Sequence, residues 1–276
     1  MNNKMGFAAV LAIVFSSQIG AGILTLPSQL APYGMFGVYG WIFAGVEAML
    51  LAFIFSELCS IFPITGGPHI YVQKTFGNTA AFFTGWTYWV ASLVSNIVLV
   101  ITAIGCLAPF FPSASPIFYT ILEIFLLLML MWVNCTSIKL SGRLETVLTL
   151  LKFIPFAIVP VAILGKFDAS NINLLPIHAD QSSFNLLISV LSTSFFCFIG
   201  VECATTPAGS VENPSKTIPR AILFGTFCVT LIYFINNLAV MGILSSEILA
   251  KSSAPFVDAV RIAFGTNISF ALAIIT

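Results

Sequence analysis

The sequence predicts an all-α integral membrane protein, and three observations lead to this fold class. Hydrophobic residues make up 59% of the 276 residues and charged residues only 7%, whereas a soluble domain has about 25% charged residues. Seven apolar runs are long enough to cross a bilayer core of ~30 Å as helices. The first run contains an interruption, Ile19-Gly20-Ala21-Gly22-Ile23, that has a counterpart in the sixth run.

Each full run is expected to form one transmembrane helix, and together the runs form a single transmembrane domain over residues 1–276. The runs cover residues 7–30, 36–62, 80–107, 117–133, 144–164, 184–210 and 221–244, with a partial run at residues 267–276. The partial run would rise only ~15 Å as a helix, so it cannot cross a bilayer.

The first run is interrupted at its centre by two glycines. Glycine weakens a helix interior by roughly 1 kcal/mol. In hydrocarbon, an unwound backbone is tolerated only where protein buries it or where it lines a water-filled cavity. Gly20 and Gly22 therefore predict a cavity at membrane depth.

The sixth run contains a similar interruption. Residues 19–27 and 199–207 share an Ile-Gly pair, a Thr and a Pro at the same offsets. Five runs begin between the two interruptions, so the first and sixth helices would cross the membrane in opposite directions. This pattern indicates an inverted five-helix repeat with a broken first helix in each copy, although chance matches of residues common in membrane helices would also produce it. Because the second copy supplies only two helices and a fragment, we expect the chain to be truncated in helix 8.

The distribution of positive charge predicts the orientation. Lysine and arginine are enriched in cytoplasmic loops, and with a cytoplasmic N-terminus seven of the ten lie on or toward that side. We therefore expect a multi-pass protein of the cell (inner) membrane with its N-terminus in the cytoplasm. The net charge of zero gives no sign of a nucleic-acid partner.

Enzymatic activity is not expected. The sequence contains no His-Glu-x-x-His, no Gly-x-Ser-x-Gly and no Gly-Lys-Ser/Thr phosphate loop. With only two histidines, far apart, neither a metal site nor a cofactor is expected.

Several motifs resemble those of the amino acid-polyamine-organocation superfamily. They are the break at residues 19–27, Gly66-Gly67 with Tyr71, and the segment 198–220. Within the superfamily the chain is most similar to the basic amino acid/polyamine antiporters, such as the arginine/agmatine exchanger, through essentially its whole length. The resemblance implies a LeuT-type fold, normally of twelve helices, of which this chain would hold the first seven and the start of the eighth.

The two breaks are the predicted substrate site, because unwound backbone and half-helix ends can bind the carboxylate and the amino group of an amino acid. The residues expected to bind substrate there are Ile19, Gly20, Ala21, Gly22, Ile23, Phe196, Phe198, Ile199 and Gly200. On the third helix, Tyr88, Ser92 and Asn96 share one face. By resemblance that face lines the side-chain pocket; ordinary hydrogen bonding between helices is the alternative.

Some positions depart from the arginine/agmatine exchanger. Phe196 stands where that protein has a gating tryptophan, and Ala21 replaces a serine. An aromatic ring at position 196 can form a cation-π contact with a substrate, or it can face lipid or pack. The departures leave open which amino acid is the substrate.

Several ionisable residues lie within the apolar runs, where each costs at least ~2.5 kcal/mol at the helix centre. Glu202, beside the second break, is the candidate for proton coupling, as is Lys152 before Pro155, unless the lysine snorkels to the cytoplasm. The sequence assigns no role to Glu47 or Glu123.

These observations favour an amino acid transporter, an antiporter or proton-coupled permease for cationic amino acids or polyamines, that works by alternating access in the lipid bilayer. The alternative is a non-transporting remnant, or half of a split transporter that needs a complementing polypeptide. A homodimer is also compatible with the sequence. A heptahelical receptor would fit the number of runs, but it would not explain the match between Gly20 and Gly200.

Overall fold

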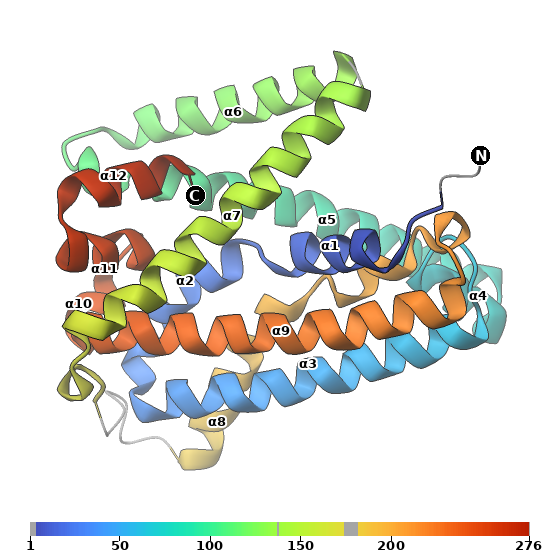
Figure 1. Ribbon diagram of the computed structural model, residues 1–276, viewed down its shortest axis with the longest axis horizontal. Coiled ribbons are helices and arrows are strands. Elements are labelled where there is room, and N and C mark those ends of the chain that lie inside the picture. The colour runs from blue at the N-terminus through green and yellow to red at the C-terminus, as the bar shows by residue number, and fades with distance from the viewer. Residues whose placement is uncertain (1–3, 137, 174–181, 276) are drawn as a thin grey trace. The chain divides into compact units, whose positions relative to one another are not determined.

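The computed structural model of the chain describes residues 4–136, 138–173 and 182–275, and within these ranges it contains helices and no strand (Figure 1). The α-helices are α1 (Phe7–Gln18), α2 (Ala21–Leu30), α3 (Met35–Ile61), α4 (Pro68–Phe76), α5 (Asn78–Gly105), α6 (Pro116–Thr136), α7 (Ile138–Lys166), α8 (Ser183–Phe195), α9 (Pro214–Ile243), α10 (Ser246–Lys251), α11 (Pro255–Phe264) and α12 (Thr266–Ile275). Short 3-10 helices are η1 (Ala31–Tyr33), η2 (Ala108–Phe110), η3 (Ala169–Asn171), η4 (Phe196–Phe198), η5 (Val201–Thr205) and η6 (Ala208–Ser210).

Five helical stretches in the described ranges are long and apolar enough to cross a membrane, and α1 with α2 and η1 would add a sixth as a broken span. The five are Met35–Ile61, Asn78–Phe110, Pro116–Thr136, Ser183–Thr205 and Pro214–Ile243. The predicted run 144–164 lies within α7, where Leu150–Ala162 is a shorter apolar helix. These helices support the predicted fold class at the level of an all-helical membrane protein.

The two predicted breaks differ in length. In the first run only Ile19 and Gly20 leave the helix, because α2 already begins at Ala21 and contains Gly22. Gly22 is the second residue of α2, so it lies outside the helix interior, where glycine is most destabilising. In the sixth run, predicted as residues 184–210, α8 ends at Phe195 and three 3-10 helices follow. The predicted partial run at residues 267–276 falls in α12; Thr276 lies outside the described residues.

The chain divides into two compact units that cut across several helices. The first unit contains Met1–Gly20, Tyr39–Ser95 and Leu187–Phe234, and the second contains Ala21–Val38, Asn96–Leu186 and Ile235–Thr276. Each unit is described separately below.

The first unit packs α1, α3 and α9 around the 3-10 helices η5 and η6. Helix α1 buries Val10, Val14 and Gln18, which recur every four residues and so share one face. Helix α3 contributes small residues at the same spacing, Ala48 and Ala52, both fully buried. Small residues allow membrane helices to approach closely, so α3 can pack near the break.

Two prolines inside helices each leave a backbone carbonyl without its usual partner, and another helix supplies one. Proline has no N–H, so the carbonyl four residues earlier loses its hydrogen bond. In the first unit, Pro219 leaves the carbonyl of Ser215 free, and the Ser60 hydroxyl of α3 donates to it at 3.2 Å. This hydrogen bond replaces the one that the proline removes and joins α3 to α9.

The second unit repeats this arrangement on α7. Pro160 frees the carbonyl of Phe156, and the Asn236 amide of α9 donates to that carbonyl at 3.2 Å. The Phe156 ring also packs edge-on against Phe256 of α11, with ring centroids 5.7 Å apart. Helix α11 lies against α7, α2 and α12 and thereby forms the centre of this unit.

Candidate functional site

The second break has a backbone conformation that only glycine adopts readily. After η4, Ile199 is extended and Gly200 has φ 111°, in the left-handed region. A residue with a Cβ is disfavoured there. The Glu202 side chain turns back, and its Oε2 accepts a hydrogen bond from the Gly200 N–H at 3.1 Å. Glu202 therefore caps an N–H group that the unwound backbone exposes.

The two breaks meet within the first unit. The Ser17 hydroxyl, near the end of α1, lies 3.0 Å from the carbonyl oxygen of Gly200 and 2.8 Å from the carbonyl oxygen of Ile13 in its own helix, so its one proton is shared between the two acceptors. A Cβ added to Gly200 would lie 2.6 Å from the Ser17 carbonyl oxygen, closer than such contacts occur. Gly200 is therefore required both by its φ angle and by the backbone of α1 beside it.

The last turn of α1 is held by α9. Gln18 is 2% exposed, and its Nε2 donates to the Thr226 hydroxyl at 2.9 Å. The Tyr233 hydroxyl donates to the main-chain carbonyl of Gln18, one of the carbonyls that lose their helical partner at the break. The side-chain Oε1 of Gln18 is buried and has no hydrogen-bond partner among the described residues. An acceptor of this kind suits an ammonium group.

Aromatic side chains pack behind the break. Phe198 is 1% exposed, and its ring centroid lies 5.3 Å from that of Tyr233 and 6.4 Å from that of Trp41. Trp41 and Tyr233 pack edge-on with centroids 5.6 Å apart. Phe198, predicted to bind substrate, is thus a core residue that supports the break, whereas Phe196, at 47% exposure, is open.

A chain of hydrogen bonds connects α5 to Glu202. The Tyr88 hydroxyl lies 3.3 Å from Cys203 Sγ, and that thiol donates to Glu202 Oε1 at 3.7 Å. With the thiol proton directed at Glu202, the Tyr88 hydroxyl is the donor to the sulfur. The carboxylate is therefore connected to Gly200 on one side and, through Cys203, to α5 on the other.

The other predicted residue of this α5 face in the first unit has a local role. The Ser92 hydroxyl donates to the carbonyl of Tyr88 at 2.8 Å, a common arrangement of serine within a helix. That hydrogen bond is intrahelical, so it engages no other helix.

The predicted site residues are divided between the two units. Those in the first unit are Ile19, Gly20, Tyr88, Ser92, Phe196, Phe198, Ile199, Gly200 and Glu202; those in the second are Ala21, Gly22, Ile23, Asn96 and Lys152. Within the second unit, Ile23 is fully buried on α2, Asn96 is exposed on α5, and Lys152 is half-buried on α7. The contacts described above belong to the first unit alone.

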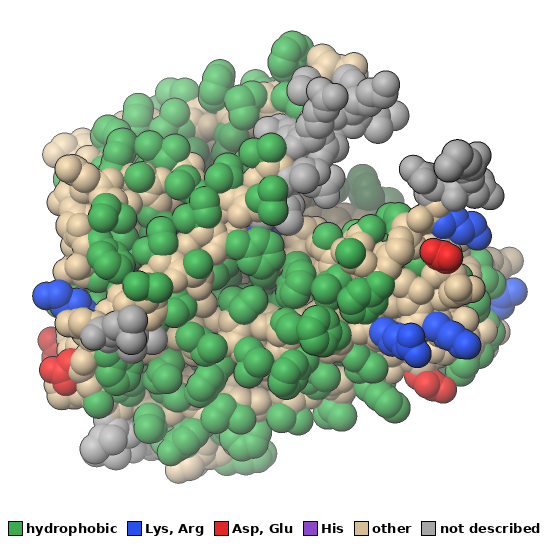
Figure 2. All heavy atoms as spheres, viewed as in Figure 1, with side chains coloured by type: hydrophobic (Ala, Val, Ile, Leu, Met, Phe, Trp, Pro, Cys, Tyr) green, Lys and Arg blue, Asp and Glu red, His purple; other side chains and the backbone are tan. Residues whose placement is uncertain are grey.

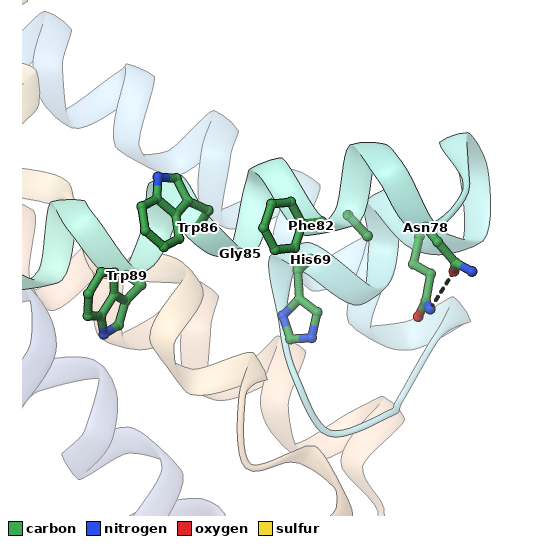
Figure 3. Close-up of a pocket in the computed structure, with 8 residues that line it drawn as sticks. His69, Asn78, Phe82, Gly85, Trp86 and Trp89 are labelled. Carbon is green, nitrogen blue, oxygen red and sulfur yellow. Dashed lines mark hydrogen bonds between the residues drawn. The ribbon is translucent and has the colours of Figure 1, made fainter.

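A separate pocket of about 570 Å³ lies between α4 and α5 of the first unit. Figure 3 shows His69 on α4 near Gly85, and the indole rings of Trp86 and Trp89 extending from α5. Their ring centroids are 5.3 Å apart. At its rim the Gln73 amide donates to Asn78 Oδ1 at 2.9 Å. The lining contains no carboxylate and none of the predicted site residues, so it offers no counter-charge for a cationic substrate.

Comparison with known proteins identifies the family. A family model described as amino acid permease matches residues 5–276. The chain belongs to the amino acid permease family. This places it in the amino acid-polyamine-organocation superfamily and confirms the resemblance predicted from the motifs. Because the permeases are transporters, the prediction that the chain is not an enzyme is confirmed as well.

Curated members of the permease family show similarity along most of this chain. A cadaverine/lysine antiporter of Escherichia coli (strain K12) is 32% identical over 259 residues, which cover 92% of this chain and 57% of that protein. The putrescine transporter PotE of Haemophilus influenzae is 29% identical over 259 residues, and PotE of Escherichia coli (strain K12) is 29% identical over 265 residues. These matches cover 92% of this chain and 59% and 58% of the two transporters. The chain therefore spans less than two thirds of the length of these relatives.

Sequence reasoning missed three residues that hold the break. Ser17 and Gln18 were visible as polar residues just before Gly20, but nothing local indicated that they bond to Gly200 and Thr226. Tyr233 lies far along the chain, within an apolar run. The only signal in the sequence was a polar side chain within an apolar run, and such a signal does not identify the residue that it will bind.

Proposed function

We propose that this chain functions in the transport of an amino acid or polyamine by alternating access, with the substrate bound where the two breaks meet. The contact of the Ser17 hydroxyl with the Gly200 carbonyl carries this proposal, because it joins the helix end at the first break to the unwound segment of the second, 183 residues away. The names of the similar proteins, cadaverine/lysine antiporter and putrescine transporter, support a cationic substrate. We expect exchange as the mode of transport.

The chemistry around the break fits ammonium groups. Glu202 supplies a carboxylate, and the buried Oε1 of Gln18 supplies an acceptor without a partner among the described residues. Lysine and a diamine of similar length share a terminal ammonium group, so one acceptor set can serve both. In this proposal the free backbone N–H groups at the breaks bind the lysine carboxylate, which the diamine lacks.

The proposal includes three finer features that the sequence suggests. The fold would be of the LeuT type, with the first and sixth helices broken in inverted repeats. The protein would lie in the inner membrane of the cell, with its N-terminus in the cytoplasm. Glu202 would change protonation during the transport cycle. Lys152, on α7, the fifth predicted span, would take part in proton coupling.

Ligand binding to the purified protein tests the site. Lysine, cadaverine or putrescine should raise the thermal unfolding midpoint, because a ligand that binds only the folded state stabilises it. Norleucine, which lacks the terminal ammonium group, should have a smaller effect. Gly200→Leu or Gly20→Leu should abolish the shift and leave membrane insertion intact.

Gly105→Leu is the matched control for these variants, because a Cβ at Gly105 meets no atom within 4 Å. It should bind ligand as the unaltered protein does. Equal ligand shifts in Gly200→Leu and Gly105→Leu would rule out the two-break site.

Counterflow in proteoliposomes tests transport itself. Vesicles preloaded with cadaverine should take up labelled lysine faster than protein-free vesicles. No flux above protein-free vesicles, from correctly inserted protein, would show that this chain does not transport alone. Flux that appears only with a second polypeptide would then favour a split transporter. No flux with or without the second polypeptide would favour a non-transporting protein.

A further inference from the structure

The first unit contains an apolar groove between α3 and α9 that the proposed transport site does not use. Its volume is about 640 Å³. Ile42, Val46, Leu50 and Phe53 of α3 line it, each about half exposed or more, as do Phe227 and Leu231 of α9. At its floor the helices approach closely, since a Cβ on Gly45 would clash with the Thr230 side chain. Because Gly45 has no side chain, α3 and α9 contact each other there, and this contact forms the floor of the groove.

The groove matches the depth of one bilayer leaflet. On α9 it runs from Leu223 to Phe234, and eleven residues of α-helix rise about 16 Å. Half of a ~30 Å hydrocarbon core is about 15 Å. A second copy of a membrane helix would need a contact surface along both leaflets, whereas a lipid acyl chain occupies one. The length of the groove therefore favours an acyl chain.

Positive side chains continue the groove toward the start of α9. Lys216, Arg220, Leu223, Phe227 and Leu231 are spaced four, three, four and four residues apart, so they form one stripe along the helix. Both cations are exposed. By helical rise Arg220 lies about 5 Å beyond Leu223, within a headgroup layer that is about 5–8 Å thick on each side. Lys216 lies about 10 Å beyond Leu223, just outside that layer, and its long side chain can reach back to the phosphate.

Other charged groups lie near this end of the two helices. Helices α3 and α9 are antiparallel here, because the hydroxyls of Ser56 and Ser60 donate to the carbonyls of Pro219 and Ser215. This register brings Glu57 of α3 to the same end, and Glu212 and Lys4 lie beside the start of α9. Figure 2 shows Lys and Arg side chains gathered beside the start of α9, with hydrophobic side chains along the rest of α3 and α9.

We propose that this groove binds an anionic phospholipid, with one acyl chain between α3 and α9 and the phosphate at Lys216 and Arg220. The Arg220 guanidinium can donate two parallel hydrogen bonds to phosphate oxygens, and Lys216 adds a point charge. Burying the exposed side chains of Val46, Leu50 and Phe53 against the acyl chain fixes the lipid along the groove. Glu57 opposes the anionic headgroup and limits its affinity.

Lipid binding to the delipidated, purified protein tests this proposal without a transport assay. Native mass spectrometry should show phosphatidylglycerol bound more tightly than phosphatidylcholine of the same chain length. Each basic residue near a membrane surface contributes about a factor of five to the affinity for anionic lipid. The double variant Lys216→Gln/Arg220→Gln should therefore lower the affinity for phosphatidylglycerol about 10- to 30-fold, whereas Glu57→Gln should raise that affinity. Lys74→Gln/Lys251→Gln removes two charges elsewhere and should leave the affinity unchanged.

A second pair of variants tests the acyl chain. Val46→Trp fills the groove and should abolish retention of phosphatidylglycerol, while Ile54→Trp, at an exposed α3 position outside the groove, should not. Glycerol phosphate, which lacks acyl chains, should not compete. Equal binding of both lipids, or equal effects of Val46→Trp and Ile54→Trp, would overturn the proposal. Loss of a dimer in Val46→Trp with unchanged lipid binding would also overturn it and assign the groove to a second copy.

Discussion

At the scale of single residues, Glu202 is the side chain whose surroundings bear most directly on the proposed transport. It accepts hydrogen bonds from the Gly200 N–H and the Cys203 thiol, and Cys203 in turn contacts Tyr88 of α5. Protonation of Glu202 would remove the negative charge beside the Gly200 N–H, where the second break touches α1. A change of charge at one carboxyl group can therefore alter the packing between the two breaks.

Replacing Glu202 with glutamine tests this role. Glutamine keeps an acceptor oxygen for the Gly200 N–H but cannot change its charge, so the pH dependence of lysine counterflow should flatten. Glu123→Gln, at a carboxyl group on α6, is the control and should keep the normal profile. A normal pH profile in Glu202→Gln would remove Glu202 from the coupling mechanism.

Tyr71 on α4 gives a prediction about stability. Its side chain is 5% exposed, and this burial raises the pKa of the phenol from 10.0 to about 12, although the nearby Thr205 hydroxyl opposes the change. Below pH 10 the phenol is protonated in both the folded and unfolded states. Between pH 10 and 12 the unfolded chain ionises while the folded protein keeps its proton, so stability should fall by roughly 2–3 kcal/mol.

The variant Tyr71→Phe removes this group, and the loss of stability from pH 10 to pH 12 should be smaller than in the unaltered protein. Thermal unfolding in detergent across this range measures the difference. Parallel curves of stability against pH for the two proteins would show that burial does not raise the pKa of the Tyr71 phenol.

At the scale of helices, α7 and α9 each contain a proline whose missing hydrogen bond another helix replaces. Ser60 serves the carbonyl freed by Pro219, and Asn236 serves the one freed by Pro160. Each helix thus keeps its length across an internal proline because a polar side chain on a neighbour satisfies the backbone. The same principle holds at the break, where Tyr233 donates to the carbonyl of Gln18.

A double-mutant cycle tests this compensation. Asn236→Ala should destabilise the protein by about 1 kcal/mol, because it leaves the buried Phe156 carbonyl without its donor. In a Pro160→Ala background the new N–H group can bond to that carbonyl, so the same change should cost less. Equal costs in both backgrounds, measured by the unfolding midpoint, would show that Asn236 acts elsewhere.

At the scale of the whole molecule, the extent of the chain relative to its relatives bears on activity. It spans 57% of the cadaverine/lysine antiporter and 58–59% of the putrescine transporters. Helix α6 buries none of its residues, and α5 exposes Tyr88, Ser92 and Asn96 along one helix. Polar side chains in a membrane helix usually face protein or a water-filled cavity. In the proposed function, this polar face of α5 would therefore either line the substrate cavity or contact further protein.

Coexpression separates these two possibilities. If further protein covers α5, a second polypeptide that corresponds to the remainder of the cadaverine/lysine antiporter should copurify with this chain and raise lysine counterflow. Replacing Asn96 with leucine should weaken copurification, while Ile101→Leu, at another exposed position of α5, should not. Equal flux with and without the second polypeptide would reject the idea that α5 needs this cover.

The sequence by itself determined the class of the molecule, its family and the existence of both breaks. Those properties depend on local features: apolar runs long enough to span a bilayer, glycines within them, and motifs such as Gly66-Gly67, whose φ angles are 132° and 70°. The tertiary structure alone decided that Ser17 contacts Gly200 and that Phe198 supports the break from the core. It also decided that Ser60 and Asn236 donate hydrogen bonds to the carbonyls that prolines leave without a helical partner. Such partners lie tens to hundreds of residues apart, and only the packing of the helices selects them.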